Sequence, residues 1–346
     1  MVHLMDLVKK RTRPAEDSAG KTLTSVERIN QTDEKGETRL HKAVHKGDIR
    51  LVYGLVNSGA DVNKPNDYGR RPFHDAVALG DIEMADHLVL LGADKEARAD
   101  NGANALEIAV ANKNPDMVEY LASIKSNMDA RNKDGENVLH SFSLKVESDR
   151  DLQRQLVELG TDINGQDKFG KCPLHHQIIK KEMATVSALL KLGANPNAAD
   201  NNGITPMHEA AVYGNERMLN RLKSFGGYIN VQDKEGETPL YKAVKEKNAE
   251  AVKTLLEMNA KLGIKDNYGR TILNLETTGE IKSMILKEAK RRRDGRTTNE
   301  PRDKRLSENG QTAKVQTPQP NTVAFLRSHG SVSVDKSVQP VDRQRG

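Results

Sequence analysis

The apolar positions of residues 38–59 are spaced as in two short helices placed one after the other. Leu40, Ala43 and Val44 follow the spacing i, i+3, i+4, which puts them on one helical face. A second apolar face is formed by Ile49, Val52, Leu55 and Val56. Gly59 stands where the second helix must end, because glycine tolerates the left-handed conformation common at helix C-termini. This segment therefore predicts a pair of amphipathic helices.

The same pattern recurs along most of the chain. Its most regular marker is a glycine that returns every 33 residues, with one step of 35, at Gly36, Gly69, Gly102, Gly135, Gly170, Gly203, Gly236 and Gly269. An apolar residue follows each glycine four positions later, at Leu40, Phe73, Leu106, Leu139, Leu174, Met207, Leu240 and Leu273. Because one unit is too short to bury its own apolar face, we expect neighbouring units to stack into a continuous core.

A shared motif opens the helical pairs, in the forms TRLHKA (38–43), RPFHDA (71–76), CPLHHQ (172–177), TPMHEA (205–210) and TPLYKA (238–243). These segments resemble the TPLHxA signature of ankyrin repeats, and GADVN, GTDIN and GANPN are similar to the end of a repeat in that family. The resemblance covers about residues 33–290 as eight tandem units. It implies an all-α ankyrin-repeat solenoid of helix-turn-helix units joined by hairpin-like loops.

The chain divides into three expected segments. These are an N-terminal extension without repeats at 1–32, the ankyrin-repeat domain at 33–290, and a disordered basic tail at 291–346 that is poor in apolar residues. The fourth unit carries two additional residues, which we place in its helical hairpin near 145–151. The eighth unit is polar and degenerate, as expected of a unit that caps a stack.

Charge and cysteine content narrow the setting in which the chain works. The formal net charge of +5 is divided unevenly, with +7 over residues 287–346 and −4 over residues 33–286. The one cysteine, Cys172, excludes an internal disulfide framework and favours a reducing compartment, so we expect the nucleus and/or the cytoplasm. No run of about 18 apolar residues occurs, so no membrane-spanning helix is expected. We also expect a monomer.

The histidines raise the question of a metal site. HKAVH (41–45) has the spacing of the zinc-binding pair of metalloproteases, but Lys42 stands where that motif has its glutamate, and no third ligand is evident. One position of the repeat motif holds His41, His74, His140, His175 and His208. The resemblance to ankyrin repeats implies that this side chain bonds to neighbouring backbone and ties the units together. We expect no metal, no cofactor and no enzymatic activity.

Binding surfaces are better supported, because the loop tips and first helices of ankyrin stacks line a concave groove. The residue before the loop glycine is aromatic in three units, at Tyr68, Phe169 and Tyr268. Aromatic residues are enriched among interface anchors, although each ring could instead cover its own loop. The other groove candidates are Tyr213, Leu79, His45, Lys46 and Arg70. The sequence thus predicts an interaction scaffold or adaptor that binds a protein or peptide.

Two further hypotheses concern the nucleus. A basic run near the end of the repeats is a nuclear-import candidate, carried by Lys290, Arg291, Arg292 and Arg293. The basic tail is also a candidate for weak, salt-sensitive contact with nucleic acid, or it only keeps the chain solvated. As an alternative function, GETRLHKAVHKGD and HEAAVYG are similar to repeats of nuclear ankyrin proteins of chromatin and DNA repair, some of which read histone tails. Asp75 and Glu209 would supply acidic groups, whereas the Trp of such readers is absent.

Overall fold

A computed structural model describes residues 24–297 of the chain, with side chains described up to residue 294. Within this range every regular element is a helix, apart from one isolated antiparallel bridge between Thr32 and Thr38. The short helix α2 (Ser25–Ile29) comes first. The all-α fold expected from the sequence is confirmed.

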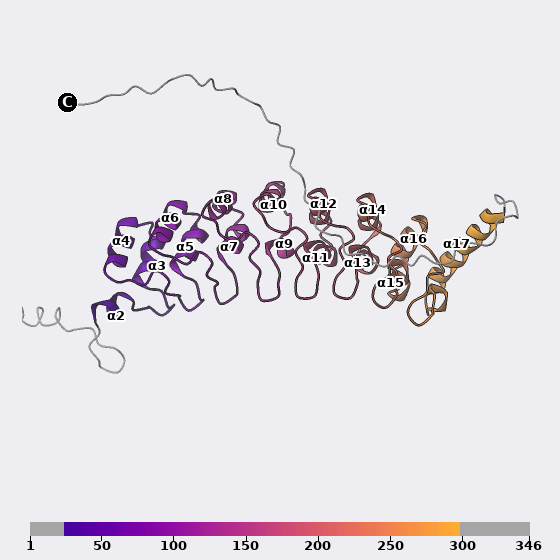
Figure 1. Ribbon diagram of the computed structural model, residues 1–346, viewed down its shortest axis with the longest axis horizontal. Coiled ribbons are helices and arrows are strands. Elements are labelled where there is room, and N and C mark those ends of the chain that lie inside the picture. The colour runs from indigo at the N-terminus through magenta and orange to yellow at the C-terminus, as the bar shows by residue number, and fades with distance from the viewer. Residues whose placement is uncertain (1–23, 298–346) are drawn as a thin grey trace, which may run out of the picture. The chain divides into compact units, whose positions relative to one another are not determined.

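Seven pairs of antiparallel helices follow α2, and Figure 1 shows the two members of each pair in two rows. The first five pairs are α3 (Arg39–His45) with α4 (Ile49–Asn57), α5 (Pro72–Leu79) with α6 (Ile82–Leu90), α7 (Ala105–Ala111) with α8 (Pro115–Ser123), α9 (Val138–Ser141) with α10 (Ser148–Glu158), and α11 (Pro173–Ile179) with α12 (Met183–Lys191). The last two are α13 (Pro206–Tyr213) with α14 (Glu216–Ser224), and α15 (Pro239–Lys245) with α16 (Ala249–Glu257). The 3-10 helix η1 (Ile272–Asn274) and the long helix α17 (Gly279–Thr297) close the described part.

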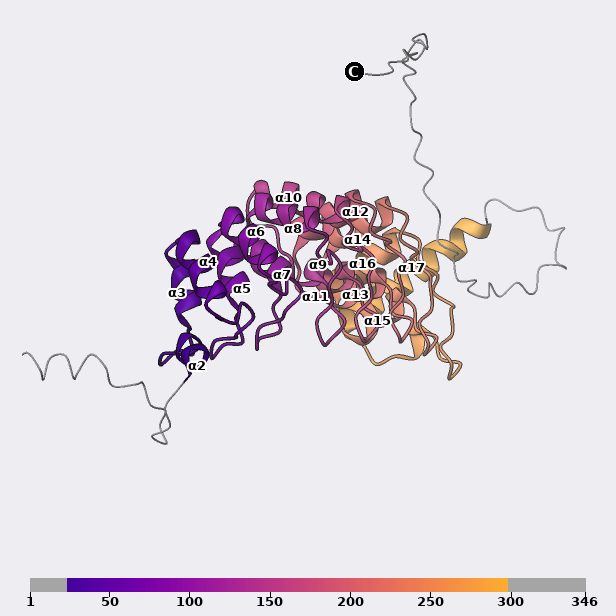
Figure 2. The ribbon, with the colours of Figure 1, turned by 60° about the vertical axis from the view of Figure 1, so that its left-hand side comes forward.

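The repeats form one continuous core because each first helix packs on the first helix of the next unit (Figure 2). The apolar residue four positions after each loop glycine is buried in the first seven units, as at Leu40 and Leu174. Full burial of one such side chain stabilises the fold by about 1.5–3 kcal/mol. In the last unit a 3-10 turn replaces the helix, so Ile272 is buried and Leu273 is exposed.

The loops between units are fixed by their own side chains. In the second unit, Asn66 accepts hydrogen bonds from the backbone N–H groups of Tyr68 and Arg70, both at 3.0 Å. Gly69 follows the tip with φ +68°, a conformation that side chains other than glycine rarely adopt. Asn or Asp makes the same pair of bonds in most other loops, for example Asp167 and Asp266. We call the surface formed by these loop tips and the first helices the loop face.

The boundary placed at residue 33 is wrong, because residues 24–32 already belong to the stack. Asn30 accepts from the Asp61 N–H at 2.8 Å and donates to the Gly59 carbonyl at 2.9 Å. Asn63, one repeat later, bonds in the same way to the next unit. Sequence reasoning missed this half-repeat because a five-residue helix carries too few apolar positions to show a period.

The fourth unit departs from the others at the place where the two additional residues lie. Helix α9 ends at Ser141 and α10 begins at Ser148, which leaves residues 142–147 outside any helix. Buried Asp149 holds this segment by accepting from the N–H groups of Lys145 and Val146 at 2.5 and 2.9 Å. The Lys113 ammonium binds the other carboxylate oxygen at 2.5 Å.

The expected start of a disordered tail at residue 291 is also wrong. Helix α17 continues through Thr297, and Arg292 in it reaches back to the Ala260 carbonyl at 2.8 Å. The remainder of the expected tail, residues 298–346, lies outside the described part of the chain. None of the described helices is long and apolar enough to cross a membrane.

Candidate functional site

The repeated histidines link each unit to the next. In all five, Nδ1 accepts from the backbone N–H of the residue that caps its own helix, at 3.0–3.3 Å. Nε2 lies 2.9–3.2 Å from a backbone carbonyl in the following loop, which requires the proton on Nε2. The bonding to neighbouring backbone that the ankyrin resemblance implied is therefore present.

Other side chains take over this link in the third and seventh units, which lack the histidine. In the third unit, Glu107 accepts from the Asn104 N–H at 2.9 Å, and Arg98 donates to the Arg131 carbonyl at 2.7 Å. In the seventh unit, the Tyr241 hydroxyl donates to Asp266 at 2.7 Å. Burial raises the pKa of Tyr241 to about 12, so it stays a donor. The position is thus structural, with or without histidine.

In several units the residue that follows this position forms ion pairs with the loops across the loop face. Lys42 binds Asp33 at 2.7 Å, and Glu209 binds Lys171 of the preceding unit at 2.7 Å. Lys242 lies among three carboxylates, those of Asp233, Glu235 and Glu237. This acidic group has the spacing of metal ligands, but a lysine ammonium already occupies its centre.

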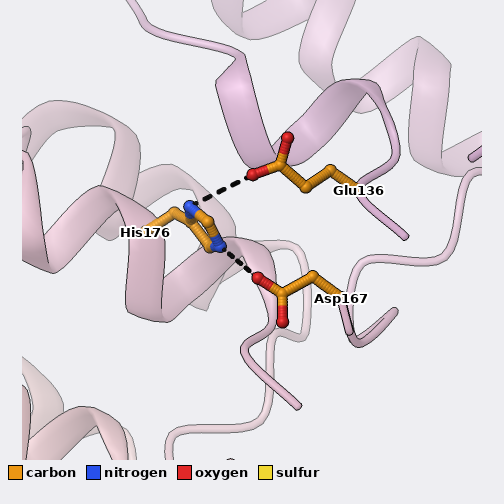
Figure 3. A group of neighbouring side chains, drawn as sticks. All are labelled: Glu136, Asp167 and His176. Atoms are coloured by element: carbon orange, nitrogen blue, oxygen red, sulfur yellow. Dashed lines mark hydrogen bonds and ion pairs between the residues drawn. The ribbon is translucent and has the colours of Figure 1, made fainter. Parts of the chain in front are cut away.

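A second group with metal-ligand spacing joins the loops of the fourth and fifth units. Figure 3 shows the His176 ring between two carboxylates, with Nε2 2.8 Å from Asp167 and Nδ1 3.8 Å from Glu136. A metal ion needs its ligand atoms gathered around one point, whereas these carboxylates lie at opposite nitrogens of the ring. Lys42 holds the corresponding place in the first unit. We therefore interpret His176 as a polar bridge between loops, hydrogen-bonded to Asp167.

Two of the predicted groove residues, Arg70 and His45, meet at Asp75 near the N-terminal end of the loop face. The Arg70 Nε lies 3.1 Å from one oxygen of Asp75, and the His45 Nε2 lies 3.4 Å from the other. Burial raises the pKa of Asp75, and the Arg70 charge opposes this shift. Lys46, which caps α3, stays exposed. The positive charge expected here is thus partly neutralised by Asp75.

The aromatic tips are exposed but far apart in the stack. Tyr68 is 64% exposed, Phe169 57% and Tyr268 79%, and two other loops separate each of them from the next. Lys168 lies 5.0 Å from the Phe169 ring and Arg270 lies 4.9 Å from the Tyr268 ring. These cations leave more than half of each ring open. The three rings are therefore separate exposed positions and do not form one patch.

Two apolar candidates lie at the ends of first helices. Leu79 ends α5 and Tyr213 ends α13, and their side chains are 56% and 44% exposed. No ring pair among the described residues joins Tyr213 to an aromatic tip. They remain single exposed positions on the loop face.

The import candidates divide into two kinds. Arg291 and Arg292 both bind Glu288, each at 2.6 Å, whereas Lys290 and Arg293 are exposed on α17 and do not bind it. The Arg291 hydrogen bond, helped by Arg292, lowers the pKa of Glu288 to about 2. The basic composition of this segment predicts the import candidate, but it does not predict that Arg291 and Arg292 stabilise the helix.

Cys172 has no catalytic arrangement. It is buried at the N-cap of α11, with Sγ 3.1 Å from Nδ1 of His175, in the place where Thr38 and Thr205 bond to their histidines. Burial raises the pKa of the Cys172 thiol, which disfavours the thiolate that a nucleophile requires. Cys172 is therefore a buried structural residue at this cap position.

Comparison with known proteins gives a family match. A family model described as ankyrin repeats (3 copies) matches residues 15–99, 142–233 and 213–277, which together make up more than half of the chain. No curated protein matches the sequence. The repeated histidine links, the fixed loops and this match agree with one another, and the chain belongs to the ankyrin-repeat family.

Proposed function

We propose that this protein is a non-enzymatic scaffold or adaptor that binds a protein or peptide along its loop face. Ankyrin repeats are, in general, modules for protein–protein interaction. The observation that carries the proposal is the exposure of aromatic rings on rigid loop tips, at Tyr68, Phe169 and Tyr268. An exposed ring gains free energy when a partner covers it, and aromatic residues dominate interface energetics.

The rigidity of these tips favours binding. Each aromatic residue donates its backbone N–H to an Asn or Asp of its own loop, as in Tyr68 to Asn66 and Phe169 to Asp167. A pre-ordered surface loses little conformational entropy on docking, so more of the contact energy remains as affinity. Because two loops separate successive rings, the partner that fits is an extended segment or a domain that spans several units.

The charged residues indicate what kind of partner binds only at the N-terminal end of the loop face. Lys46 and the Arg70–His45–Asp75 cluster lie together near the N-terminal units, and the exposed Lys46 is the group left to pair with a partner carboxylate. The histone-tail alternative relies on Asp75 and Glu209, but Arg70 and Lys171 already bind these carboxylates. No observation favours that alternative over general protein binding.

Residence in the nucleus and/or the cytoplasm is part of the same proposal. Lys290 and Arg293 are the exposed members of the import candidate that do not bind Glu288. A fluorescent fusion carrying Lys290→Ala and Arg293→Ala should lose nuclear signal while it keeps its fold. A distribution equal to that of the unchanged fusion would remove this segment as an import signal.

The binding proposal is tested with a fourfold variant, Tyr68→Ala, Phe169→Ala, Tyr213→Ala and Tyr268→Ala. The variant should bind the partners captured by the unchanged protein at least about tenfold more weakly, since hot-spot residues each contribute about 2 kcal/mol or more. The matched control is Tyr228→Ala with Phe225→Ala and Leu90→Ala, which removes exposed apolar side chains outside the predicted groove positions. Equal capture by all three proteins would show that the loop-face rings do not bind partners.

A further inference from the structure

Helix α17 closes the described stack, and one line of its surface faces away from the other units. Ile281 and Ile285 are buried on its inner side, where the helix packs on α16. Lys282, Leu286 and Lys290 follow at intervals of four residues and therefore lie along one line on the opposite side. Leu286 is 52% exposed, whereas Ile281 and Ile285 of the same helix are fully buried.

Three lysines surround this exposed leucine. Lys282, Lys287 and Lys290 line a shallow depression together with Leu286. Within the described side chains, no carboxylate lies within ion-pair distance of any of the three ammonium groups. Arg291 and Arg292, in the same helix, are both bound by Glu288. The helix thus separates cations that stabilise the fold from cations that are available to a ligand.

We propose that Lys282, Leu286, Lys287 and Lys290 form a docking site for an acidic segment of another protein, and we call this surface the terminal basic face. Carboxylates of the partner pair with the three lysines, and an apolar side chain of the partner rests on Leu286. Complementary charge steers such a segment to the helix, and apolar contact retains it. This site is separate from the loop face and does not depend on the function proposed for it.

Nucleic acid and lipid fit this surface less well. Phosphate groups pair with lysines but gain nothing from Leu286, and the described outer side of α17 has no aromatic ring on which a base can stack. A membrane surface requires a broad apolar face. Ile281 and Ile285 of α17 are buried against α16, so Leu286 offers too little apolar surface to insert into a membrane. A mixed acidic and apolar protein segment uses all four residues.

The test uses the full-length protein and a labelled probe peptide of about 18 residues, long enough to be helical. The peptide consists of glutamate and alanine with one central leucine, and binding is measured by fluorescence anisotropy at two salt concentrations. We expect Leu286→Gln to weaken binding about fivefold. The triple variant Lys282→Gln, Lys287→Gln, Lys290→Gln should weaken it more than tenfold and reduce its salt dependence. A second peptide, in which glutamine replaces the leucine, should bind the unchanged protein and the Leu286→Gln variant with equal affinity.

Matched controls carry the same substitutions on other helices. They are Leu90→Gln on α6 and the triple variant Lys191→Gln, Lys223→Gln, Lys253→Gln on α12, α14 and α16, all at exposed positions. Both controls should bind like the unchanged protein, and all variants should keep its urea midpoint. The proposal is overturned if the unchanged protein does not bind the peptide, if the controls lose as much affinity, or if Leu286→Gln has no effect. Tighter binding of a DNA duplex or of phosphatidylserine vesicles than of the peptide would assign the face to that ligand instead.

Discussion

At the scale of single residues, the histidine links explain both the cohesion of the stack and a sensitivity to acid. His175 is fully buried, accepts from the Cys172 N–H through Nδ1, and contacts the Ile204 carbonyl of the next unit through Nε2. A proton on Nδ1 would remove the acceptor and bury a charge. Burial accordingly lowers the pKa of His175 to about 4, and it lowers the pKa of His74, His140 and His208 as well.

These pKa shifts predict that the protein loses stability in mild acid. In the unfolded chain a histidine has a pKa of about 6.5, so below pH 6.5 the unfolded state binds protons that the folded state does not. The free energy of unfolding should therefore be constant above about pH 7 and fall as the pH drops from about 6.5 towards 4. Urea unfolding at pH 7.5 and at pH 5.5 measures this loss of stability. Equal stability at the two pH values would contradict the burial of neutral histidines.

The sequence predicts the histidine links but not their substitutes. The five histidines can be found in the sequence because they share one position of the repeat motif. Each of them bonds to backbone of the next unit, so one rule covers all five links. Glu107 with Arg98, and Tyr241 with Asp266, come from positions 9 and 25 residues apart, which no periodicity connects. The His176 bridge was missed for the same reason, since Glu136 and Asp167 approach it only when two loops stack.

At the scale of elements, α17 is held to the stack by more than its two buried isoleucines. Arg292 donates to the carbonyls of Leu256 and Ala260, at 3.2 and 2.8 Å, where α16 ends. Carbonyls at a helix end lack partners inside the helix, so a cation there satisfies them and interacts favourably with the helix dipole. Arg292 thus connects the last regular helical pair to the helix that caps it.

Replacing this residue should loosen the end of the stack. We expect Arg292→Ala to lower the free energy of unfolding by about 1–2 kcal/mol, because two charged hydrogen bonds and the Glu288 contact are lost. The matched control is Arg293→Ala, whose side chain is 76% exposed and should change stability by less than about 0.5 kcal/mol. Urea denaturation followed by circular dichroism measures both, and equal effects would show that Arg292 does not hold α17.

Element boundaries were the weaker part of the sequence prediction. Composition placed the tail at 291 because arginine-rich segments are usually solvated. Instead, Arg291 and Arg292 bind Glu288, Arg292 bonds to the carbonyls of Leu256 and Ala260, and α17 continues through Thr297. Unit four shows the same limit. The two additional residues were visible, but the segment that follows α9 is held by buried Asp149, whose partners are Lys113 and the adjacent Lys145 and Val146.

At the scale of the whole described stack, the proposed function depends on repeated units that differ in the exposed residues of their loop tips. The links between units are alike, so the loops are held in a fixed order and their tips become a row of positions for contact. Most tips are polar, and Tyr68, Phe169 and Tyr268 differ from them by large exposed rings. The architecture could be predicted from the sequence, whereas the separation of the rings and the neutralisation of Arg70 by Asp75 required the structure.

The central claim is that partners bind along the loop face, and site-specific photocrosslinking tests it most directly. The crosslinker benzoylphenylalanine replaces one residue at a time in the full-length protein, at Tyr68, Phe169, Tyr213 and Tyr268, and at Tyr228 and Leu90 as exposed controls. The account predicts that one partner forms adducts from the four loop-face positions and not from the two controls. Adducts confined to Tyr228 and Leu90, with none from the four loop-face positions, would contradict it.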